Sequence, residues 1–362
     1  MEPPVKPEHV LITGGAGFIG SHVADACLRR GYRVTAYDSL DAQVHPSGRW
    51  PGYLDRRVRR IRGDICDAEL LRKALRGCDL VFHLAAAVGV EQSQSEAVKY
   101  ARVNSLGTAT LLEVLIRMPR RPKKLVVASS MSVYGEGAYF CPGCGVPREP
   151  AGVEARDGRR GFEPRCAACR TALVSKPVAE RHPLRPLSFY AVTKRGQEET
   201  ALALGRAHGI PVVALRLFNT YGPRQALSNP YNGVLAIFAN ALLRGEAPIV
   251  HEDGAQRRDF TSVRDAARAF LLAADTDRAD GRAVNVGTGR PRSVLDVAEL
   301  LAGLCGARVR PTVSGAVRSG DIRHCHADIS LARRRLGYRP AVKLEDGLVE
   351  LVRWARRELR AG

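Results

Sequence analysis

The sequence has no long apolar run and few aromatic side chains. Aromatic residues make up 6% of the 362 residues. No apolar stretch approaches the roughly 20 residues that a membrane-spanning helix needs. The chain also opens without the pattern of a secretory signal peptide. We therefore expect a cytoplasmic protein that has no membrane partner.

Acidic residues are few relative to basic residues. The chain has 56 Lys and Arg against 37 Asp and Glu, which gives a formal net charge of +19. Such a balance can indicate a nucleic acid or a membrane surface as partner. However, the arginines are scattered over nearly every expected helix, and no basic block alternates with aromatic residues. These absences argue against nucleic-acid binding, and the positive charge also suits a doubly anionic substrate.

Internal repeats and low-complexity tracts are also absent. The hydrophobic fraction of 45% and the charged fraction of 26% are ordinary for a soluble globular protein. The length is sufficient for a large core, in one two-lobed domain or in two domains.

Four of the nine cysteines form two C-x-x-C pairs, and the other five stand alone. The pairs are Cys141 with Cys144 and Cys166 with Cys169. In a cytoplasmic chain this spacing indicates a metal site rather than disulfides. Four thiolates suit a closed structural zinc site that leaves no open position for chemistry. A metal-free loop and a redox-active dithiol are the alternatives.

The first segment of the chain carries three glycines between a strand pattern and a helix pattern. An apolar run ends at Thr13, Gly14, Gly17 and Gly20 follow, and a helical pattern covers residues 18–30. The first glycine permits a tight turn, the second lets the backbone approach a pyrophosphate, and the third lets the helix pack on the strand. Free N–H groups at the helix start then face the phosphates. This context predicts a dinucleotide site rather than a glycine-rich turn without a ligand.

An acidic residue follows the second strand pattern. Asp38 comes directly after residues 33–37 and lies 18 residues beyond Gly20. A carboxylate near this spacing holds the adenine ribose hydroxyls, and it repels a 2′-phosphate. The sequence therefore favours NAD over NADP.

Strand and helix patterns alternate through the first half of the chain. Further strands are expected at residues 58–62, 79–86, 124–135 and 211–217, and helices at 68–75, 96–118 and 189–207. This alternation predicts an α/β fold with a Rossmann-type doubly wound parallel sheet, whose ligand lies at the carboxyl ends of the strands. Residues 136–187, which contain the cysteine pairs, interrupt it and show neither helical nor strand periodicity.

The second half has fewer strand signals. Helical patterns cover residues 233–244, 263–274, 293–304 and 344–359, with short extended pieces near 249, 260, 284 and 309. We expect an NAD-binding domain at 1–217, with a four-cysteine, zinc-ribbon-like insertion at 136–187. A smaller α+β lobe at 218–362 is expected mainly to bind the substrate.

A tyrosine and a lysine share one face of the helix expected at 189–207. Tyr190 and Lys194 are four residues apart, so their side chains lie one turn from each other. An ammonium beside a phenol favours the phenolate, which is a usable general base. Alone, the pair is also typical of a solvated helix face. Together with the glycine loop and Ser130 at a strand end, it indicates a catalytic group.

These motifs resemble the extended short-chain dehydrogenase/reductases of the nucleotide-sugar epimerase/dehydratase family. The resemblance covers nearly the whole chain, at residues 13–20, 63–64, 83–86, 104, 129–130, 134–135, 190–194, 216–223, 258–260, 285–289 and 320–321. Within the family, the cysteine insertion and residues 131–137, 222–231 and 320–325 resemble the dTDP-L-rhamnose 4-epimerase-like and UDP-glucose (galactose) 4-epimerase-like groups. The chain departs from that pattern at residues 187–189 and 196.

The resemblance implies roles for individual residues. The catalytic residues would be Ser130, Tyr190 and Lys194. A tightly bound NAD would contact Gly14, Gly17, Phe18, Ile19, Asp38, Asp64, Ile65, Leu84, Ala85, Ala86, Asn104, Ser129, Tyr190, Lys194 and Phe218. A nucleotide-diphosphate sugar would contact Ser132, Asn219, Asn232, Arg258, Arg318, Asp321 and Cys325. Arginine suits the diphosphate because its planar fork of donors matches phosphate oxygens. The family also commonly forms homodimers through the helices that carry Asn104 and Tyr190.

Two positions distinguish reactions within the family. The 4,6-dehydratases carry Asp-Glu directly after the catalytic Ser or Thr, and the decarboxylases carry a Glu, whereas this chain has Met131 and Ser132. Without either acid, oxidation and re-reduction at one carbon remains, which is 4-epimerisation by an isomerase. A ketoreductase of a nucleotide 4-keto sugar and a non-catalytic NAD-binding scaffold are the alternatives. Cys325 stands where the bulk of a residue limits the sugar pocket in UDP-galactose 4-epimerases, unless it merely packs.

Overall fold

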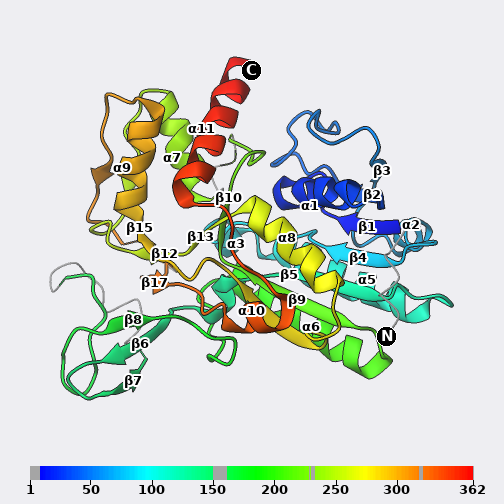
Figure 1. Ribbon diagram of the computed structural model, residues 1–362, viewed down its shortest axis with the longest axis horizontal. Coiled ribbons are helices and arrows are strands. Elements are labelled where there is room, and N and C mark those ends of the chain that lie inside the picture. Colours follow the sequence, from blue (N-terminus) through cyan, green and yellow to red (C-terminus); the bar gives the residue numbers. More distant parts are fainter. Residues whose placement is uncertain (1–8, 150–160, 228, 230–232, 318–320, 362) are drawn as a thin grey trace.

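The chain folds around one seven-stranded sheet (Figure 1). The computed structural model describes residues 9–149, 161–227, 229, 233–317 and 321–361. In chain order the strands are β1 His9–Thr13, β2 Arg33–Asp38, β3 Arg59–Arg62, β4 Leu80–His83, β5 Lys124–Ser130, β9 Val212–Leu217 and β14 Arg282–Val286. Their order across the sheet is β14-β9-β5-β4-β1-β2-β3, and every neighbouring pair is parallel. The predicted doubly wound parallel sheet is confirmed.

Helices cover both faces of this sheet because its central strands, such as β1, β4 and β9, are buried on both sides. Val10 and Ile12 of β1 pack with α1 (Phe18–Arg29), α8 (Val263–Ala274) and α10 (Ser330–Leu336). Leu11 points to the opposite core, with α2 (Ala68–Ala74), α5 (Gly107–Arg117) and α6 (Phe189–His208). Alternate residues of a strand face opposite sides of a sheet. A strand buried on both sides therefore reads as a continuous apolar run.

The helix expected at 96–118 is interrupted by a wider turn. It consists of α4 (Ala97–Tyr100), a π-helical turn (Ala101–Leu106) and α5, and α3 (Gln92–Ser95) precedes it. Asn104 lies in the π turn. Single π turns inside helices are rare and are frequent at functional sites.

A second lobe is built from three helices around its own core. They are α7 (Val234–Leu243), α9 (Val294–Cys305) and α11 (Leu344–Ala361). Short strands form three small sheets that are separate from the large one: β10 Asn219–Tyr221 with β13 Phe260–Ser262, β11 Ile249–Val250 with β16 Thr312–Val313, and β12 Arg257–Arg258 between β15 Arg292–Ser293 and β17 His324–Cys325. The large sheet extends beyond the domain boundary expected at residue 217, because it includes β14. That the part before residue 217 binds NAD and the part after it mainly binds the substrate stays a prediction.

The cysteine insertion has its own small sheet, although the sequence showed no periodicity there. The antiparallel order is β7-β6-β8, with β6 at Ala138–Cys141, β7 at Val146–Arg148 and β8 at Val174–Lys176. Strands of three or four residues are too short for an alternating pattern to show. In Figure 1 this sheet lies apart from the large sheet and below the lobe of α7, α9 and α11.

Candidate active site

The glycine loop between β1 and α1 approaches the end of β4 closely. Gly14 has a φ of +69°, and a Cβ built on it would lie 2.8 Å from the backbone nitrogen of Ala85. A Cβ at Gly20 would collide with the carbonyl oxygen of Gly14. Gly17 is the N-cap of α1 and provides no side-chain cap. Hydrogen-bond donors at the helix start therefore remain available to an anion. The geometry fits the pyrophosphate of a dinucleotide.

The carboxylate of Asp38 lies against this loop. One oxygen accepts the backbone N–H of Ala16 at 3.0 Å, and the other accepts that of Leu40 at 2.9 Å. The other residues expected to line the cofactor lie on the first turn of α1, directly after β4, or three residues after β3 (Phe18 and Ile19; Leu84, Ala85 and Ala86; Ile65). The structure thus brings the N-terminal candidates to one edge of the sheet.

Two expected cofactor contacts use their polar atoms within the protein. Asp64 pairs with Arg102 at 2.7 Å. The amide of Asn104 accepts the N–H of Ala87 at 2.7 Å and donates to Thr193 at 3.0 Å. The Asn104 side chain is completely buried. It therefore connects the π turn to the segment after β4 and to α6.

Ser130 and Tyr190 meet at the carboxyl end of β5. The Ser130 hydroxyl oxygen accepts the hydroxyl of Ser132 at 2.9 Å and its backbone N–H at 3.2 Å. Burial raises the pKa of Tyr190, while its hydrogen bond with Ser130 acts in the opposite direction. The backbone N–H of Tyr190 donates to Ser93 at 3.0 Å. The Tyr100 ring meets the Tyr190 ring edge-on, with 6.3 Å between the centroids. These contacts fix the phenol beside the serine hydroxyl.

Lys194 lies one turn further along α6 and is buried. Its ammonium donates to the carbonyl oxygen of Ala128 at 2.6 Å and to the side-chain oxygen of Gln197. Burial lowers the pKa of Lys194 to about 7, against a smaller opposite effect of Glu198. The ammonium is therefore expected to titrate near neutral pH.

A buried histidine holds Gln197 in place behind the lysine. The Gln197 amide nitrogen lies 2.9 Å from Nε2 of His83 and 2.8 Å from the Thr108 hydroxyl. An amide nitrogen can only donate, so Nε2 of His83 is the acceptor and Nδ1 carries the proton. Nδ1 then donates to Thr13 at 2.7 Å. Burial lowers the pKa of His83 to about 3, so its ring stays neutral. The sequence did not single out Gln197, whose one signal is its position three residues after Lys194.

Ser129 faces away from Tyr190, into a buried ionic cluster. Its hydroxyl donates to Glu198 at 2.5 Å. The same carboxylate binds Arg216 through two guanidinium nitrogens, and Arg216 donates to the Tyr134 hydroxyl at 2.8 Å. Phe218 is buried beside the Tyr134 ring, with 6.4 Å between the centroids. This cluster holds the carboxyl ends of β5 and β9 together beside the site.

Asn219, expected to contact the substrate, carries a buried polar atom without a partner. Within the described part of the chain, its side-chain oxygen accepts no hydrogen bond. A buried acceptor left unsatisfied is costly, and it commonly marks a ligand or a water. This atom supports a ligand contact at Asn219.

The other residues expected to contact the substrate differ in their surroundings. The guanidinium of Arg258 donates to Asp321 at 3.0 Å and to the carbonyl oxygen of Arg323 at 2.9 Å. Cys325 is fully buried and packs in an apolar cluster with residues such as Phe218. The expectations for Asn232 and Arg318 lie outside the described residues.

The four insertion cysteines converge on one point. All four sulfur atoms lie within 4.8 Å of one another, with 3.3 Å between those of Cys141 and Cys169 and 3.7 Å between those of Cys144 and Cys166. A tetrahedral zinc with bonds of ~2.3 Å places its sulfurs about 3.8 Å apart. A Cβ on Gly143 would lie 3.1 Å from the Cys169 sulfur, so glycine leaves the room that the cluster needs. The donor set fits a structural metal.

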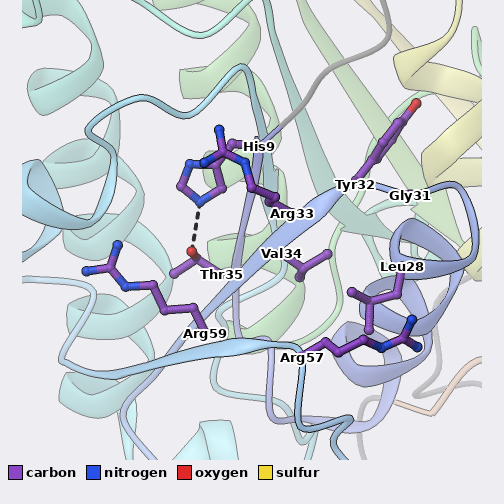
Figure 2. Close-up of a pocket in the computed structure, with 9 residues that line it drawn as sticks. All are labelled: His9, Leu28, Gly31, Tyr32, Arg33, Val34, Thr35, Arg57 and Arg59. Atoms are coloured by element: carbon purple, nitrogen blue, oxygen red, sulfur yellow. Dashed lines mark hydrogen bonds between the residues drawn. The ribbon is translucent and has the colours of Figure 1, made fainter.

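A cavity of about 440 Å³ lies at the opposite edge of the sheet (Figure 2). It is lined by His9, Leu28, Gly31, Tyr32, Arg33, Val34, Thr35, Arg57 and Arg59. His9 and Arg33 begin β1 and β2. Ligands of doubly wound sheets bind at the carboxyl ends of the strands. This cavity is therefore separate from the site around Gly14 and Tyr190.

The sequence profile of the NAD dependent epimerase/dehydratase family matches residues 10–150 and 168–287. The chain belongs to this family. Within the described part of the chain, no helix of this family member combines the length and apolarity needed to cross a membrane.

Among its relatives is the dTDP-L-rhamnose 4-epimerase of Burkholderia thailandensis, 34% identical, with 98% of this chain and 97% of the relative covered. The UDP-glucose 4-epimerase of Thermotoga maritima, solved with UDP-glucose, has a TM-score of 0.78 at 31% identity, over 97% of this chain and 99% of that one. The UDP-glucuronic acid 4-epimerase of Bacillus cereus, solved with UDP-glucuronic acid and NAD, has a TM-score of 0.79 at 29% identity, with the same coverage. The family membership and the NAD-bound neighbour confirm the expected enzyme class.

Proposed function

We propose that this family member is an NAD-dependent 4-epimerase of a dTDP- or UDP-linked hexose or 6-deoxyhexose. The observation that carries the proposal is the placement of Ser130, at the carboxyl end of β5, together with Tyr190 on α6, followed by Met131 and Ser132 instead of acids. A phenol and a hydroxyl suffice to move a proton at one carbinol. Elimination or decarboxylation would need a further acid.

The proposed chemistry assigns a task to each side chain. Tyr190, as a phenolate, takes the proton of the C4 hydroxyl, while Ser130 donates a hydrogen bond to the same oxygen. NAD, when bound, supplies the acceptor and then the donor of the C4 hydride. The 4-keto sugar turns about its diphosphate, and Tyr190 returns the proton to the new hydroxyl. The charged form of Lys194 favours the phenolate.

Incubation with a panel of dTDP- and UDP-hexoses, without added cofactor, tests this proposal. We expect a C4 epimer by chromatography with no net absorbance change at ~340 nm, because an epimerase consumes no reductant. A product that forms only with NAD(P)H and a 4-keto sugar would assign the chain to the ketoreductases instead. The absence of any product would favour a scaffold.

We also propose that the four insertion cysteines hold a structural zinc. The support is the convergence of their four sulfurs, which all lie within 4.8 Å of one another. Bound as Zn²⁺, the metal would fix the insertion and take no part in the reaction, because all four positions are filled by thiolates. Metal analysis of purified protein is expected to find about one zinc per chain, lost in Cys144→Ser and retained in Cys66→Ser.

A homodimer through α4, the π turn and α6 is our proposal for the assembly. Val98, Leu106 and Val192 lie on these adjacent helices and expose 81%, 54% and 48% of their surface. Exposed apolar groups gathered on one face commonly mark a protein interface.

A further inference from the structure

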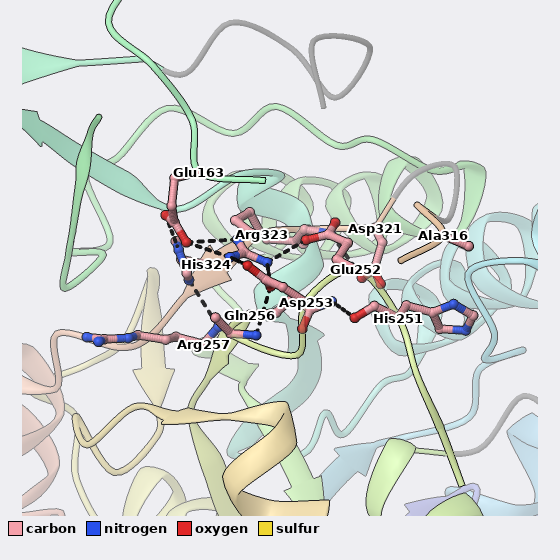
Figure 3. Close-up of polar contacts among 12 residues, drawn as sticks. Glu163, His251, Glu252, Asp253, Gln256, Arg257, Ala316, Asp321, Arg323 and His324 are labelled. Atoms are coloured by element: carbon pink, nitrogen blue, oxygen red, sulfur yellow. Dashed lines mark hydrogen bonds and ion pairs between the residues drawn. The ribbon is translucent and has the colours of Figure 1, made fainter. Parts of the chain in front are cut away.

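Arg323 is a completely buried arginine that is held by carboxylates from separate parts of the chain (Figure 3). Its guanidinium donates to Glu252 at 2.6 Å and to the two oxygens of Asp253 at 2.6 and 2.9 Å. Glu163, from the cysteine insertion, accepts from the same guanidinium at 2.5 and 3.1 Å. Burial alone would lower the pKa of Arg323, but the hydrogen bonds with Asp253 and Glu163 raise it. A buried charge needs such partners.

Glu163 holds two consecutive residues at once. While Oε1 accepts from Arg323, Oε2 lies 2.8 Å from Nε2 of His324. Nδ1 of His324 accepts the backbone N–H of Arg257 at 3.0 Å, so Nε2 carries the proton and donates to the carboxylate. Burial would raise the pKa of Glu163, but the contacts to His324 and Arg323 hold it at about 2. Both carboxylate oxygens are thus occupied by donors.

The backbone around Arg323 in turn holds Arg258, the residue expected to bind the diphosphate. Arg258 donates to the carbonyl oxygens of Arg323 and Ile322 and to the carboxylate of Asp321. Strand β17, which begins at His324, pairs with β12, which contains Arg258. The contacts therefore run without a gap from Glu163 to the Arg258 guanidinium.

The cluster also contains a strained residue. Glu252 is buried and has a φ of 51°, a left-handed conformation that is unfavourable for a residue with a side chain. Such strain persists only where the surroundings determine the conformation. The ion pair with Arg323, at 2.6 Å, and backbone hydrogen bonds with Gly315 and Ala316 help to hold it.

We propose that Glu163 is a positioning residue through which the cysteine insertion sets the affinity of the substrate lobe for a nucleoside diphosphate. This inference rests on the proposed function. Glu163 precedes Cys166 by three residues, so a metal held by the cysteines would restrain the segment that carries the carboxylate. The insertion thereby orders residues 321–325, and these order Arg258.

The substitution Glu163→Gln tests this directly because it keeps the shape and removes one acceptor. A carboxylate accepts from both Arg323 and His324, whereas an amide has one oxygen and a donor group. In the variant, the amide N–H₂ group therefore faces an N–H donor of either Arg323 or His324. Glu149→Gln is the matched control, since Glu149 lies in the same insertion and makes an exposed pair with Arg185.

Hydrogen–deuterium exchange reports on the segment independently of any reaction. In the full-length protein with its bound NAD and metal, Glu163→Gln is expected to speed amide exchange in peptides covering residues 257–258 and 321–326 by about tenfold or more. Glu149→Gln is expected to leave it unchanged. Exchange in Glu163→Gln at the wild-type rate would overturn the proposal.

Binding of UDP and dTDP, measured by calorimetry, tests the link to affinity. Glu163→Gln is expected to weaken the tighter of the two by about 5- to 20-fold, and to raise KM similarly with kcat within about threefold. NAD and metal contents stay at wild-type levels. Unchanged affinity despite faster exchange would overturn the link to Arg258. If the wild type binds neither nucleotide, the proposed function fails, and the exchange comparison still decides whether Glu163 orders the segment.

Discussion

The substitution Tyr190→Phe removes one oxygen atom and is expected to abolish most of the turnover without affecting the binding of NAD. In Tyr190→Phe the ring still meets that of Tyr100, whose centroid lies 6.3 Å away, so the local packing is expected to persist. If Tyr190 is the proposed general base, its loss lowers kcat by about 10²- to 10⁴-fold. NAD released on denaturation should match the wild type. Turnover at the wild-type rate would contradict the assigned role.

The buried Lys194 makes stability depend on pH. Its folded pKa of about 7 lies below the ordinary value of 10.5. Between these values the unfolded chain binds a proton that the folded chain does not. The cost of burying the charge is therefore fully present below about pH 7 and is relieved as the pH rises toward about 10.5. The free energy of unfolding should rise by about 1 kcal/mol per pH unit in this window.

Lys194→Met removes this titration. Denaturant unfolding at about pH 6, 8 and 9 is expected to show a flatter pH dependence for the variant than for the wild type. Met is also expected to be the more stable of the two at low pH. Parallel curves for the two proteins would show that Lys194 does not titrate in this range.

Single residues of the site differ in how far the sequence predicts them. The proximity of Tyr190 and Lys194 on α6 could be predicted because a helix places residues four apart on one face. Gln197 could not, because its role depends on His83, 114 residues away in sequence. Glu163 likewise gains its role only from Arg323, whose position the sequence does not indicate. Local spacing predicts catalytic pairs, while the groups that orient them depend on tertiary contacts.

Among the elements, the turn from β1 into α1 offers a sharp comparison of two glycines. Gly20→Ala places a Cβ against the carbonyl oxygen of Gly14, and this backbone atom cannot move away easily. At Gly196, by contrast, none of the described atoms lies within 4 Å of an added Cβ. Gly20→Ala is expected to lose most of the bound NAD and to unfold at a lower temperature.

Gly196→Ala is the control for this substitution. Gly196 lies inside α6, where alanine is expected to stabilise the protein by roughly 0.5–1 kcal/mol. Thermal unfolding and NAD content check both variants. Equal NAD content in Gly20→Ala and Gly196→Ala would show that the loop can shift to accept a Cβ at position 20 without losing NAD.

Elements were predictable in proportion to their length and burial. The central strands of the large sheet are buried on both faces, so β4 and β5 stand out as continuous runs. The strands of the insertion have three or four residues, and they pack around a small cluster of Tyr139, Leu173 and two of the cysteines, which leaves no long apolar run in the sequence. The π turn at Ala101–Leu106 has no distinct signal, since its periodicity differs from that of an α-helix over one turn only.

At the scale of the whole molecule, the exposed apolar face predicts self-association. Leu106→Asp with Val192→Asp places charges on that face and is expected to convert a dimer to a monomer in sedimentation experiments. Val313→Asp, at a residue with 45% exposure on β16 of the second lobe, is the control and should leave the assembly unchanged. A wild type that is monomeric at all concentrations would contradict the proposal.

The edge strand β14 has a consequence for how the chain is synthesised. Its partner β9 is completed at residue 217, but β14 begins only at residue 282. On the ribosome, the apolar β9 therefore remains an open sheet edge while some 65 further residues are added. Open edges pair with other chains. A chain truncated after residue 217 is therefore expected to aggregate, and nascent chains should need chaperones most while these residues are being made.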